Sequence, residues 1–281
     1  MSSPAGTECV AGGVRFRLER RAGAGRLLVL HGFAGHPEAW REVVDRLEAP
    51  GLVAAPFLPG HGPEPLRPEW TSFEAVIRDL VAAVRALDSG KWRLAGYSLG
   101  ARLGLGMLVA APRLWADALL VGVNPGLEEE AERAARRAED AARARLLRKE
   151  GLEAFVEVWE RLPLFDSQRA LPPATLAAQR SWRLAHDPRR LAWVLETLGP
   201  GAMPDLWPLL SGIAKPVRLV VGELDTRFVG IAERAAERLP AGSLTVVPGV
   251  GHNVVLEAPE AVARLLEAGT ARYRGDRGEE A

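Results

Sequence analysis

The chain has 281 residues, of which 48% are hydrophobic and 26% charged, and its formal net charge at pH 7 is zero. This length fits one large α/β domain with an insertion, and the balanced charge argues against a field that would attract nucleic acid or an anionic membrane. The single cysteine, Cys9, excludes an intramolecular disulfide and offers no metal-binding spacing. Residues 1–13 lack a secretory pattern, and no run of about 18 apolar residues follows, so we expect a cytoplasmic protein without a membrane span.

Short runs rich in Leu, Val and Ala alternate with longer amphipathic runs along most of the chain. This rhythm is typical of a mostly parallel sheet that is covered by helices on both faces, which is an α/β fold. The expected strands are residues 27–30, 52–55, 93–95, 118–121, 217–221 and 244–247. The expected helices are residues 37–47, 72–87, 99–110, 228–238 and 259–266.

The alternation stops at residues 124–208, where the pattern is helical and no strand is expected. We therefore predict an inserted helical cap over this range and an α/β core made of residues 1–123 and 209–281. Arginine and glutamate crowd the first part of the predicted cap, and Gly151 is expected to break its first helix. The charged tail, residues 271–281, is expected to fray.

The sequence Gly96-Tyr97-Ser98-Leu99-Gly100 follows the strand expected at 93–95 and precedes an expected helix. A bare G-x-S-x-G is common by chance, but the strand–turn–helix context is that of a nucleophile elbow. The serine of such an elbow takes a strained backbone conformation, and a side chain at Gly96 or Gly100 would crowd the neighbouring backbone. The pattern predicts Ser98 as a nucleophile or relay group at the carboxyl edge of the sheet.

A serine hydroxyl needs a histidine to accept its proton and an acid to hold that histidine. Asp225 and His252 follow the last two expected strands in the required order, and they are the predicted acid and base. An aspartate at a strand end is also a common turn or helix cap. Glu223 is a competing acid, but Asp225 is the residue directly followed by the expected helix.

The loop His31-Gly32-Phe33-Ala34-Gly35 follows the first expected strand. It is expected to place the Phe33 backbone N–H beside Ser98, where it would form an oxyanion hole with the Leu99 N–H. His31 is expected to orient this loop rather than carry protons, because His252 already supplies the base. For His61, in the loop Leu58-Pro59-Gly60-His61-Gly62, a structural role in a tight turn is favoured over a role in the active site.

Together these motifs resemble the α/β-hydrolase superfamily over about residues 14–268, and in particular the 2-succinyl-6-hydroxy-2,4-cyclohexadiene-1-carboxylate (SHCHC) synthase family of menaquinone biosynthesis. The core motifs that carry the resemblance are His31-Gly32-Phe33, Leu58-Pro59-Gly60-His61-Gly62, Gly96-Tyr97-Ser98-Leu99-Gly100-Ala101-Arg102 and Asn124-Pro125-Gly126-Leu127. The cap motifs are Glu132-Arg133-Ala134-Ala135-Arg136, Asp140, Phe155, Trp159, Pro163-Leu164-Phe165-Asp166-Ser167-Gln168, Gln179-Arg180 and Arg183. Ala101 and Phe57 depart from the family pattern without touching the proposed triad.

The resemblance implies a cofactor-free lyase that removes pyruvate from a polycarboxylate precursor, with arginines as carboxylate anchors. Arg102 lies four positions after Ser98 on the expected helix, so both share a face, although a salt bridge is an alternative role. The further substrate-binding residues rest on resemblance, and spacing alone does not select the two arginines among those of the cap; they are Arg136, Arg183, Tyr97 and Trp159. Packing is the alternative role of Trp159.

We hypothesise that Ser98, polarised by His252 and Asp225, removes a substrate proton while arginines and backbone N–H groups stabilise the developing negative charge. A serine hydrolase could use the same triad by acyl transfer, and a binding protein could retain the pocket without turnover. The expected partner is a small anionic substrate, with no nucleic acid, membrane, metal or cofactor involved. We expect a monomer or a small homo-oligomer.

Overall fold

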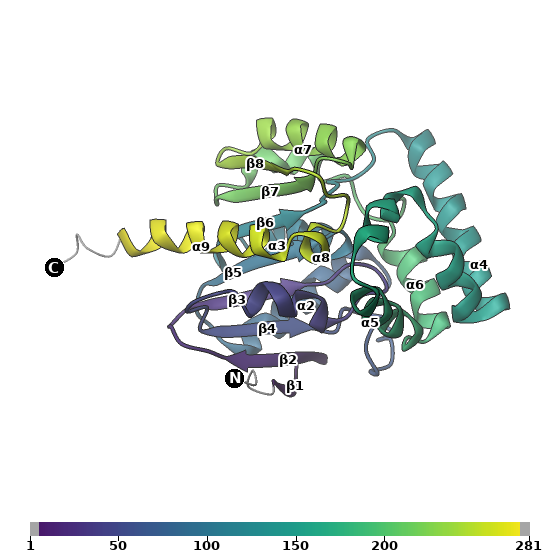
Figure 1. The fold of residues 1–281 in the computed structure, drawn as a ribbon, viewed down its shortest axis with the longest axis horizontal. Coiled ribbons are helices and arrows are strands. Elements are labelled where there is room, and N and C mark those ends of the chain that lie inside the picture. The colour runs from purple at the N-terminus through teal and green to yellow at the C-terminus, as the bar shows by residue number, and fades with distance from the viewer. Residues whose placement is uncertain (1–5, 276–281) are drawn as a thin grey trace.

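The computed structural model describes residues 6–275, with side chains described up to residue 268. Eight strands form one sheet in the order β1-β2-β4-β3-β5-β6-β7-β8 (Figure 1). From β4 to β8 every neighbouring pair is parallel, whereas β2 pairs antiparallel with β1 and with β4. This mostly parallel sheet confirms the predicted fold class. The strands are β1 (Thr7–Ala11), β2 (Val14–Arg20), β3 (Arg26–Leu30), β4 (Leu52–Pro56), β5 (Trp92–Tyr97), β6 (Trp115–Val121), β7 (Val217–Gly222) and β8 (Gly242–Val247).

The hairpin of β1 and β2 was not among the strands predicted from the sequence. Its two-residue turn is Gly12-Gly13, and both glycines have positive φ, 56° and 78°. Turns with two positive φ values match the twist of hairpin strands, so a Gly-Gly pair favours them. In β2 apolar Val14, Phe16 and Leu18 alternate with charged residues. A Gly-Gly turn followed by such an alternating run is a pattern that predicts a β-hairpin, and it was overlooked.

Helices cover both faces of the sheet, because successive strand residues point to opposite sides. One face carries β-strand residues such as Leu28 and Leu94 and packs against α2, α3, η3 and α7. The other carries residues such as Val29 and Ala95 and packs against η1, α1, α8 and α9. These elements are η1 (Pro37–Trp40), α1 (Arg41–Val44), α2 (Phe73–Leu87), α3 (Leu99–Ala110), η3 (Trp207–Gly212), α7 (Thr226–Arg238), α8 (Val254–Glu257) and α9 (Pro259–Gly275).

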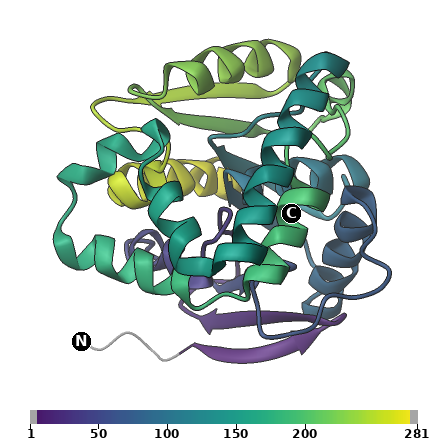
Figure 2. The same ribbon diagram turned by 90° about the vertical axis from the view of Figure 1, so that its right-hand side faces the viewer.

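Four helical elements, α4 (Glu130–Glu160), η2 (Pro163–Ala170), α5 (Pro173–Leu184) and α6 (Pro188–Leu198), lie between β6 and β7, and we call them the cap. They stand in front of the sheet when it is viewed from the side shown in Figure 2. Gly151 has φ 84° and ψ −174°, so α4 breaks there as expected. The cap has its own apolar cluster, which includes Leu147, Phe155 and Leu191 and packs against Phe33 of the core. The division of the chain at residues 124 and 208 stays a prediction.

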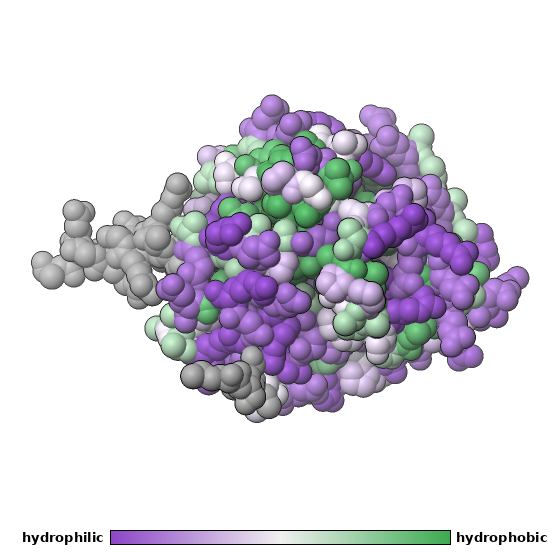
Figure 3. All heavy atoms as spheres, in the orientation of Figure 1, coloured by the Kyte–Doolittle hydropathy of each residue, from purple (hydrophilic) through white to green (hydrophobic). Residues whose placement is uncertain are grey.

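Hydrophilic side chains predominate on the face shown in Figure 3, with smaller apolar patches between them. In the described part of the chain, no helix is both long and apolar enough to span a membrane. The helix α9 runs to Gly275, so residues 271–275 of the tail that was expected to fray are helical, and residues 276–281 lie outside the described residues. The cytoplasmic setting and the oligomeric state stay predictions.

Candidate active site

Ser98 lies in a sharp turn between β5 and α3, with φ 52° and ψ −107°. Its backbone N–H donates to the Val121 carbonyl at 2.9 Å, which fixes the turn against β6. A Cβ atom on Gly96 would lie 2.5 Å from the Gly100 carbonyl oxygen, and one on Gly100 would lie 2.3 Å from the Leu30 carbonyl oxygen. Both distances are shorter than real contacts, so the expected crowding at the two glycines is confirmed. The glycines permit the strained turn that holds up the Ser98 hydroxyl.

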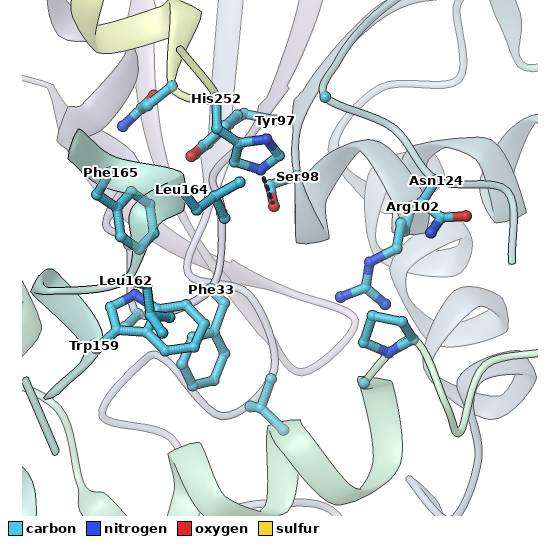
Figure 4. Close-up of a pocket in the computed structure, with 18 of the residues that line it drawn as sticks. Phe33, Tyr97, Ser98, Arg102, Asn124, Trp159, Leu162, Leu164, Phe165 and His252 are labelled. Atoms are coloured by element: carbon cyan, nitrogen blue, oxygen red, sulfur yellow. Dashed lines mark hydrogen bonds between the residues drawn. The ribbon is translucent and has the colours of Figure 1, made fainter. Parts of the chain in front are cut away.

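Ser98, His252 and Asp225 meet at the carboxyl ends of the strands. The Ser98 hydroxyl donates to His252 Nε2 at 3.1 Å (Figure 4), and His252 Nδ1 in turn donates to Asp225 Oδ2, which lies outside that view, at 2.7 Å. The His252 and Asp225 side chains are 2% and 8% exposed, so little water competes for these bonds. The arrangement can move a proton from the serine to the imidazole while the carboxylate stabilises the resulting cation.

Asp225 combines the two roles that the sequence left open. Its Oδ1 accepts from the Phe228 backbone N–H at 3.5 Å as the N-cap of α7, while its Oδ2 holds His252. The competing acid, Glu223, is exposed, and its carboxylate accepts from the Gly249 N–H at 2.9 Å instead. The structure therefore favours Asp225 as the acid partner of His252.

Two residues that the sequence analysis missed support His252. Glu257, in the short helix α8, accepts from the backbone N–H groups of Gly251 at 2.8 Å and of Asn253 at 3.2 Å. Its carboxylate thus holds the chain on both sides of His252. Gly122 has a φ of 59°, and a Cβ atom there would lie 2.9 Å from His252 Cε1. A glutamate five positions after a candidate histidine was the only pattern in the sequence that pointed to this support.

The loop after β3 passes beside Ser98. A Cβ atom on Gly32 would lie 2.7 Å from the Tyr97 ring and 3.7 Å from Ser98 Cβ. The next residue, Phe33, lines the cavity described below, and Leu99 begins α3, where a first-turn N–H has no acceptor within the helix. The oxyanion hole of Phe33 and Leu99 stays a prediction that this placement permits.

Histidine side chains tie the loops around Phe33 together. His31 Nε2 accepts from the Leu58 N–H at 3.2 Å, and His61 Nε2 accepts from the Ala34 N–H at 3.0 Å. Burial lowers the pKa of His31 to about 3, so its ring is neutral at physiological pH. His31 therefore orients the loop, as expected. His61 lies in the expected turn, and its ring also fixes the loop.

A cavity of about 310 Å³ opens over Ser98 between the core and the cap. All five predicted substrate-binding residues line it, together with Phe33, Ser98 and His252. Its charged lining residues are four arginines, and no aspartate or glutamate of the described chain lines it. The predicted residues brought together here are Tyr97, Arg102, Arg136, Trp159 and Arg183. Other residues that line the cavity were not predicted as site residues from the sequence, among them Asn124, Gln179, Arg227 and Phe228.

Arg102 is 8% exposed, and its guanidinium donates to the Leu198 carbonyl at 2.5 Å. In Figure 4 it reaches into the cavity from the side opposite Trp159 and Phe165. Burial, followed by the charge of Arg136, lowers the pKa of Arg102 to about 9, so the group is still a cation at neutral pH. No carboxylate of the described residues forms a salt bridge with it, which argues against the alternative role. A buried cation that lacks a carboxylate partner favours the binding of an anionic ligand.

The two predicted cap arginines are each held by a carboxylate. Arg136 Nε donates to both Asp140 oxygens at 3.0 Å, and Arg183 donates to Glu160 at 2.8 Å. Arg183 also lies over the Phe165 ring, 5.4 Å from its centroid. These partners orient the guanidinium groups from behind and leave their remaining N–H donors for a ligand.

Aromatic side chains form the wall of the cavity on the cap side. The Trp159 ring centroid lies 5.1 Å from that of Phe33, 5.5 Å from that of Phe155 and 5.8 Å from that of Phe165. Trp159 thus packs in an aromatic cluster, which is its alternative role, and it also lines the cavity, while its contact with a substrate stays a prediction. The Tyr97 ring lies 5.5 Å from the His252 ring, and burial raises the pKa of its hydroxyl.

Among residues 6–268, no group of three or more His, Cys, Asp or Glu side chains could hold a metal ion. The triad chemistry needs none, because the imidazole and the carboxylate supply the proton transfer. The absence of a cofactor stays a prediction.

Comparison with known proteins identifies the class to which this fold and site belong. The model of the alpha/beta hydrolase family matches residues 27–265. The chain therefore belongs to the α/β-hydrolase family.

Two of the curated relatives carry the name SHCHC synthase. A Bacillus subtilis (strain 168) protein, provisionally named SHCHC synthase, is 33% identical over 261 residues, which cover 92% of this chain and 95% of that protein. The SHCHC synthase of Salmonella heidelberg (strain SL476) is 32% identical over 87% of this chain and 93% of its own length. The structure of MenH from S. aureus superimposes with a TM-score of 0.87 at 29% identity, covering 92% of this chain and 98% of that one. Within the α/β hydrolases, the chain belongs to the SHCHC synthase family.

Proposed function

We propose that the protein is a lyase that eliminates pyruvate from a succinyl-enolpyruvyl cyclohexene carboxylate to give SHCHC in menaquinone biosynthesis. The observation that carries this proposal is the cavity over Ser98, whose charged lining consists of four arginines and, within the part of the chain that is described, no acidic side chain. A substrate with several carboxylates fits this lining, whereas a neutral ester would leave Arg102, which has no carboxylate partner among the described residues, without a counter-charge in a partly dry site. Relatives over 30% identical that carry the synthase name support the same reaction.

Binding would place the substrate between the arginines and the proton-transfer groups. Arg102 is buried without a carboxylate partner among the described residues, so a substrate carboxylate would stabilise its charge. Arg136 and Arg183 are already oriented by Asp140 and Glu160, which lowers the entropy lost on binding. Tyr97 and Trp159 would border the ring of the substrate.

The reaction would begin with removal of one substrate proton by Ser98, whose own proton passes to His252 while Asp225 stabilises the imidazolium. The electron pair of the broken C–H bond forms a ring C=C bond, and the C–O bond to the enolpyruvyl group breaks. Pyruvate leaves as its enolate, which takes up a proton from the site to become pyruvate. The Phe33 and Leu99 N–H groups would stabilise the negative charge that develops.

The test is to supply the precursor and to follow pyruvate release by the wild type and by Ser98→Ala. We expect the variant to lose most of the activity, on the order of a hundredfold or more, because positioned proton transfer contributes about 10²- to 10⁴-fold. Equal rates in both proteins would remove Ser98 from the mechanism.

A serine hydrolase with the same three residues is the rival function, since acyl transfer needs the same relay. Fluorophosphonate labelling of Ser98 and turnover of a panel of neutral esters measure it. Fast ester hydrolysis without pyruvate release would replace the lyase proposal. Failure of both assays would point to a binding protein.

A further inference from the structure

The four arginines that line the cavity differ in how they are held. Arg102, Arg136 and Arg183 are buried or half-buried, and each donates to a protein oxygen. Arg227 is exposed, and within the described part of the chain no recorded ion pair or hydrogen bond involves its guanidinium. Its side chain therefore lines the cavity on the solvent side. Binding of a ligand by its guanidinium would not require an existing ion pair or hydrogen bond within the protein to break.

The position of the Arg227 backbone is fixed by the residues beside it. Asp225 bonds His252 and caps α7, and the Phe228 ring lies 4.5 Å from the His252 ring. Arg227 stands between these two residues, in the first turn of α7. The Arg227 side chain is thus attached to a fixed segment of backbone next to the proton-transfer groups.

The local electrostatics of α7 do not favour a cation at this place. The amino-terminal end of a helix carries a partial positive charge, so a cation in the first turn is unfavourable. The first turn of α7 contains no acidic residue, and the carboxylate of its N-cap, Asp225, is already bonded to His252 and to the Phe228 N–H. A residue that breaks a local rule in this way points to a role outside its own helix.

We propose that Arg227 is a further carboxylate-binding residue, which captures a carboxylate of the substrate at the mouth of the cavity. This inference rests on the proposed function for the identity of the substrate. The guanidinium is free to pair bidentately with an incoming carboxylate, and the three inner arginines then receive the remaining negative charge. Because the pair forms near water, it contributes to binding and to its salt dependence more than to the chemical step.

The test compares the wild type with Arg227→Gln, with the conservative variant Arg227→Lys and with the control Arg113→Gln. Arg113 is exposed, lines none of the described cavities and precedes β6, at the opposite edge of the sheet from the cavity. Both glutamine variants remove one exposed positive charge, so only the position differs. Circular dichroism melts check that all four proteins are equally folded.

Two readouts separate this inference from the proposed function. The first is calorimetric binding of citrate, a tricarboxylate that needs no turnover. We expect Arg227→Gln to weaken citrate binding about three- to tenfold, Arg227→Lys to retain most of it, and Arg113→Gln to leave it unchanged. The second is pyruvate release from the precursor, where Arg227→Gln should raise KM by a similar factor, change kcat less than about twofold and flatten the dependence of kcat/KM on salt.

The outcomes are distinct. If the wild type releases no pyruvate but citrate binding depends on Arg227, the proposed function fails and the carboxylate-binding role stands. If the wild type binds no citrate, or if Arg227→Gln and Arg113→Gln behave alike in both assays, the role of Arg227 is overturned.

Discussion

Gly122 shows how a residue without a side chain shapes the candidate site. Its φ of 59° is a left-handed conformation, and a Cβ atom there would meet His252 Cε1 at 2.9 Å. We expect Gly122→Ala to push the imidazole away from Ser98 and to lower kcat by about tenfold to a hundredfold, because small misplacements of reacting groups are costly. The measurement is kcat for pyruvate release, with KM determined in parallel.

Gly249 provides the matched control for Gly122. Its φ is 71°, but a Cβ atom there would have no neighbour within 4 Å. Gly249→Ala should therefore carry the same left-handed penalty, about 1–2 kcal/mol, without moving His252. Equal kcat values in the two alanine variants would show that backbone strain, and not contact with His252, explains the effect.

Glu257 is expected to position His252 through the backbone. Glu257→Gln places an NH2 group where a carboxylate oxygen now accepts from Gly251 or Asn253, so one of these N–H groups loses its acceptor. We expect kcat to fall about tenfold with little change in KM, and the pH dependence of kcat/KM to shift. Glu260→Gln, an exposed change at the start of α9, is the control. A pH profile identical to that of the wild type would leave Glu257 with a structural role only.

Individual site residues could be predicted from the sequence where they belong to a motif. Residues that reach the site only through the tertiary fold could not be predicted. Ser98, Asp225 and His252 stand at strand ends in the expected order, so their meeting could be predicted. Gly122 and Arg227 belong to no motif. Their relation to His252 and to the cavity arises only when separate strands and loops come together.

Helix α4 needs a glycine for its backbone conformation at residue 151, whereas α7 does not need the glycine that it contains. Gly151 has φ 84° and ψ −174°, a region that is almost restricted to glycine, and nothing lies within 4 Å of its missing Cβ. Gly151→Ala should therefore cost about 1–3 kcal/mol through the backbone alone. In α7, Gly230 is helical with the same open surroundings, so Gly230→Ala should stabilise the protein by about 0.5–1 kcal/mol.

Urea unfolding measures both changes, with the same substitution in two helices as mutual control. We expect the midpoint to fall for Gly151→Ala and to rise for Gly230→Ala. A rise for both would mean that α4 can continue straight through residue 151.

The helices and strands could be predicted where a clear hydrophobic pattern extends over the whole element. The six strands and five helices expected from the sequence are all present, because parallel strands buried on both faces read as apolar runs. The hairpin of β1 and β2 was not predicted because β2 carries a charged residue at every second position and so does not form a continuous apolar run. The packing of η2 beside the loop of His252 could not be predicted either. It brings Ser167 Oγ within 2.1 Å of where a Gly251 Cβ would lie.

For the whole molecule, the contact between cap and core involves the buried His61 and the half-buried His36 and His186. His186 of the cap donates from Nδ1 to the His61 carbonyl at 3.1 Å, and the His36 ring stacks on Trp182 of α5 at 5.8 Å. Burial is the first cause that lowers the pKa of His36, His61 and His186. The junction that closes the cavity is therefore made of groups that resist protonation while folded.

This arrangement predicts how stability depends on pH. Burial lowers the pKa of His31 to about 3, whereas an unfolded histidine titrates near 6.5, so below pH 6.5 the unfolded chain binds a proton that the folded chain does not. The free energy of unfolding should fall by about 1.4 kcal/mol for each pH unit between 6.5 and 3 from His31 alone, and His61 adds to the slope in the same direction. Urea titrations at about pH 7.5, 6.5 and 5.5 measure it, since few carboxylates titrate in that range. An unfolding free energy that stays constant over this range would mean that the histidines take up protons in the folded state, and the cap junction would then have to open as the pH falls.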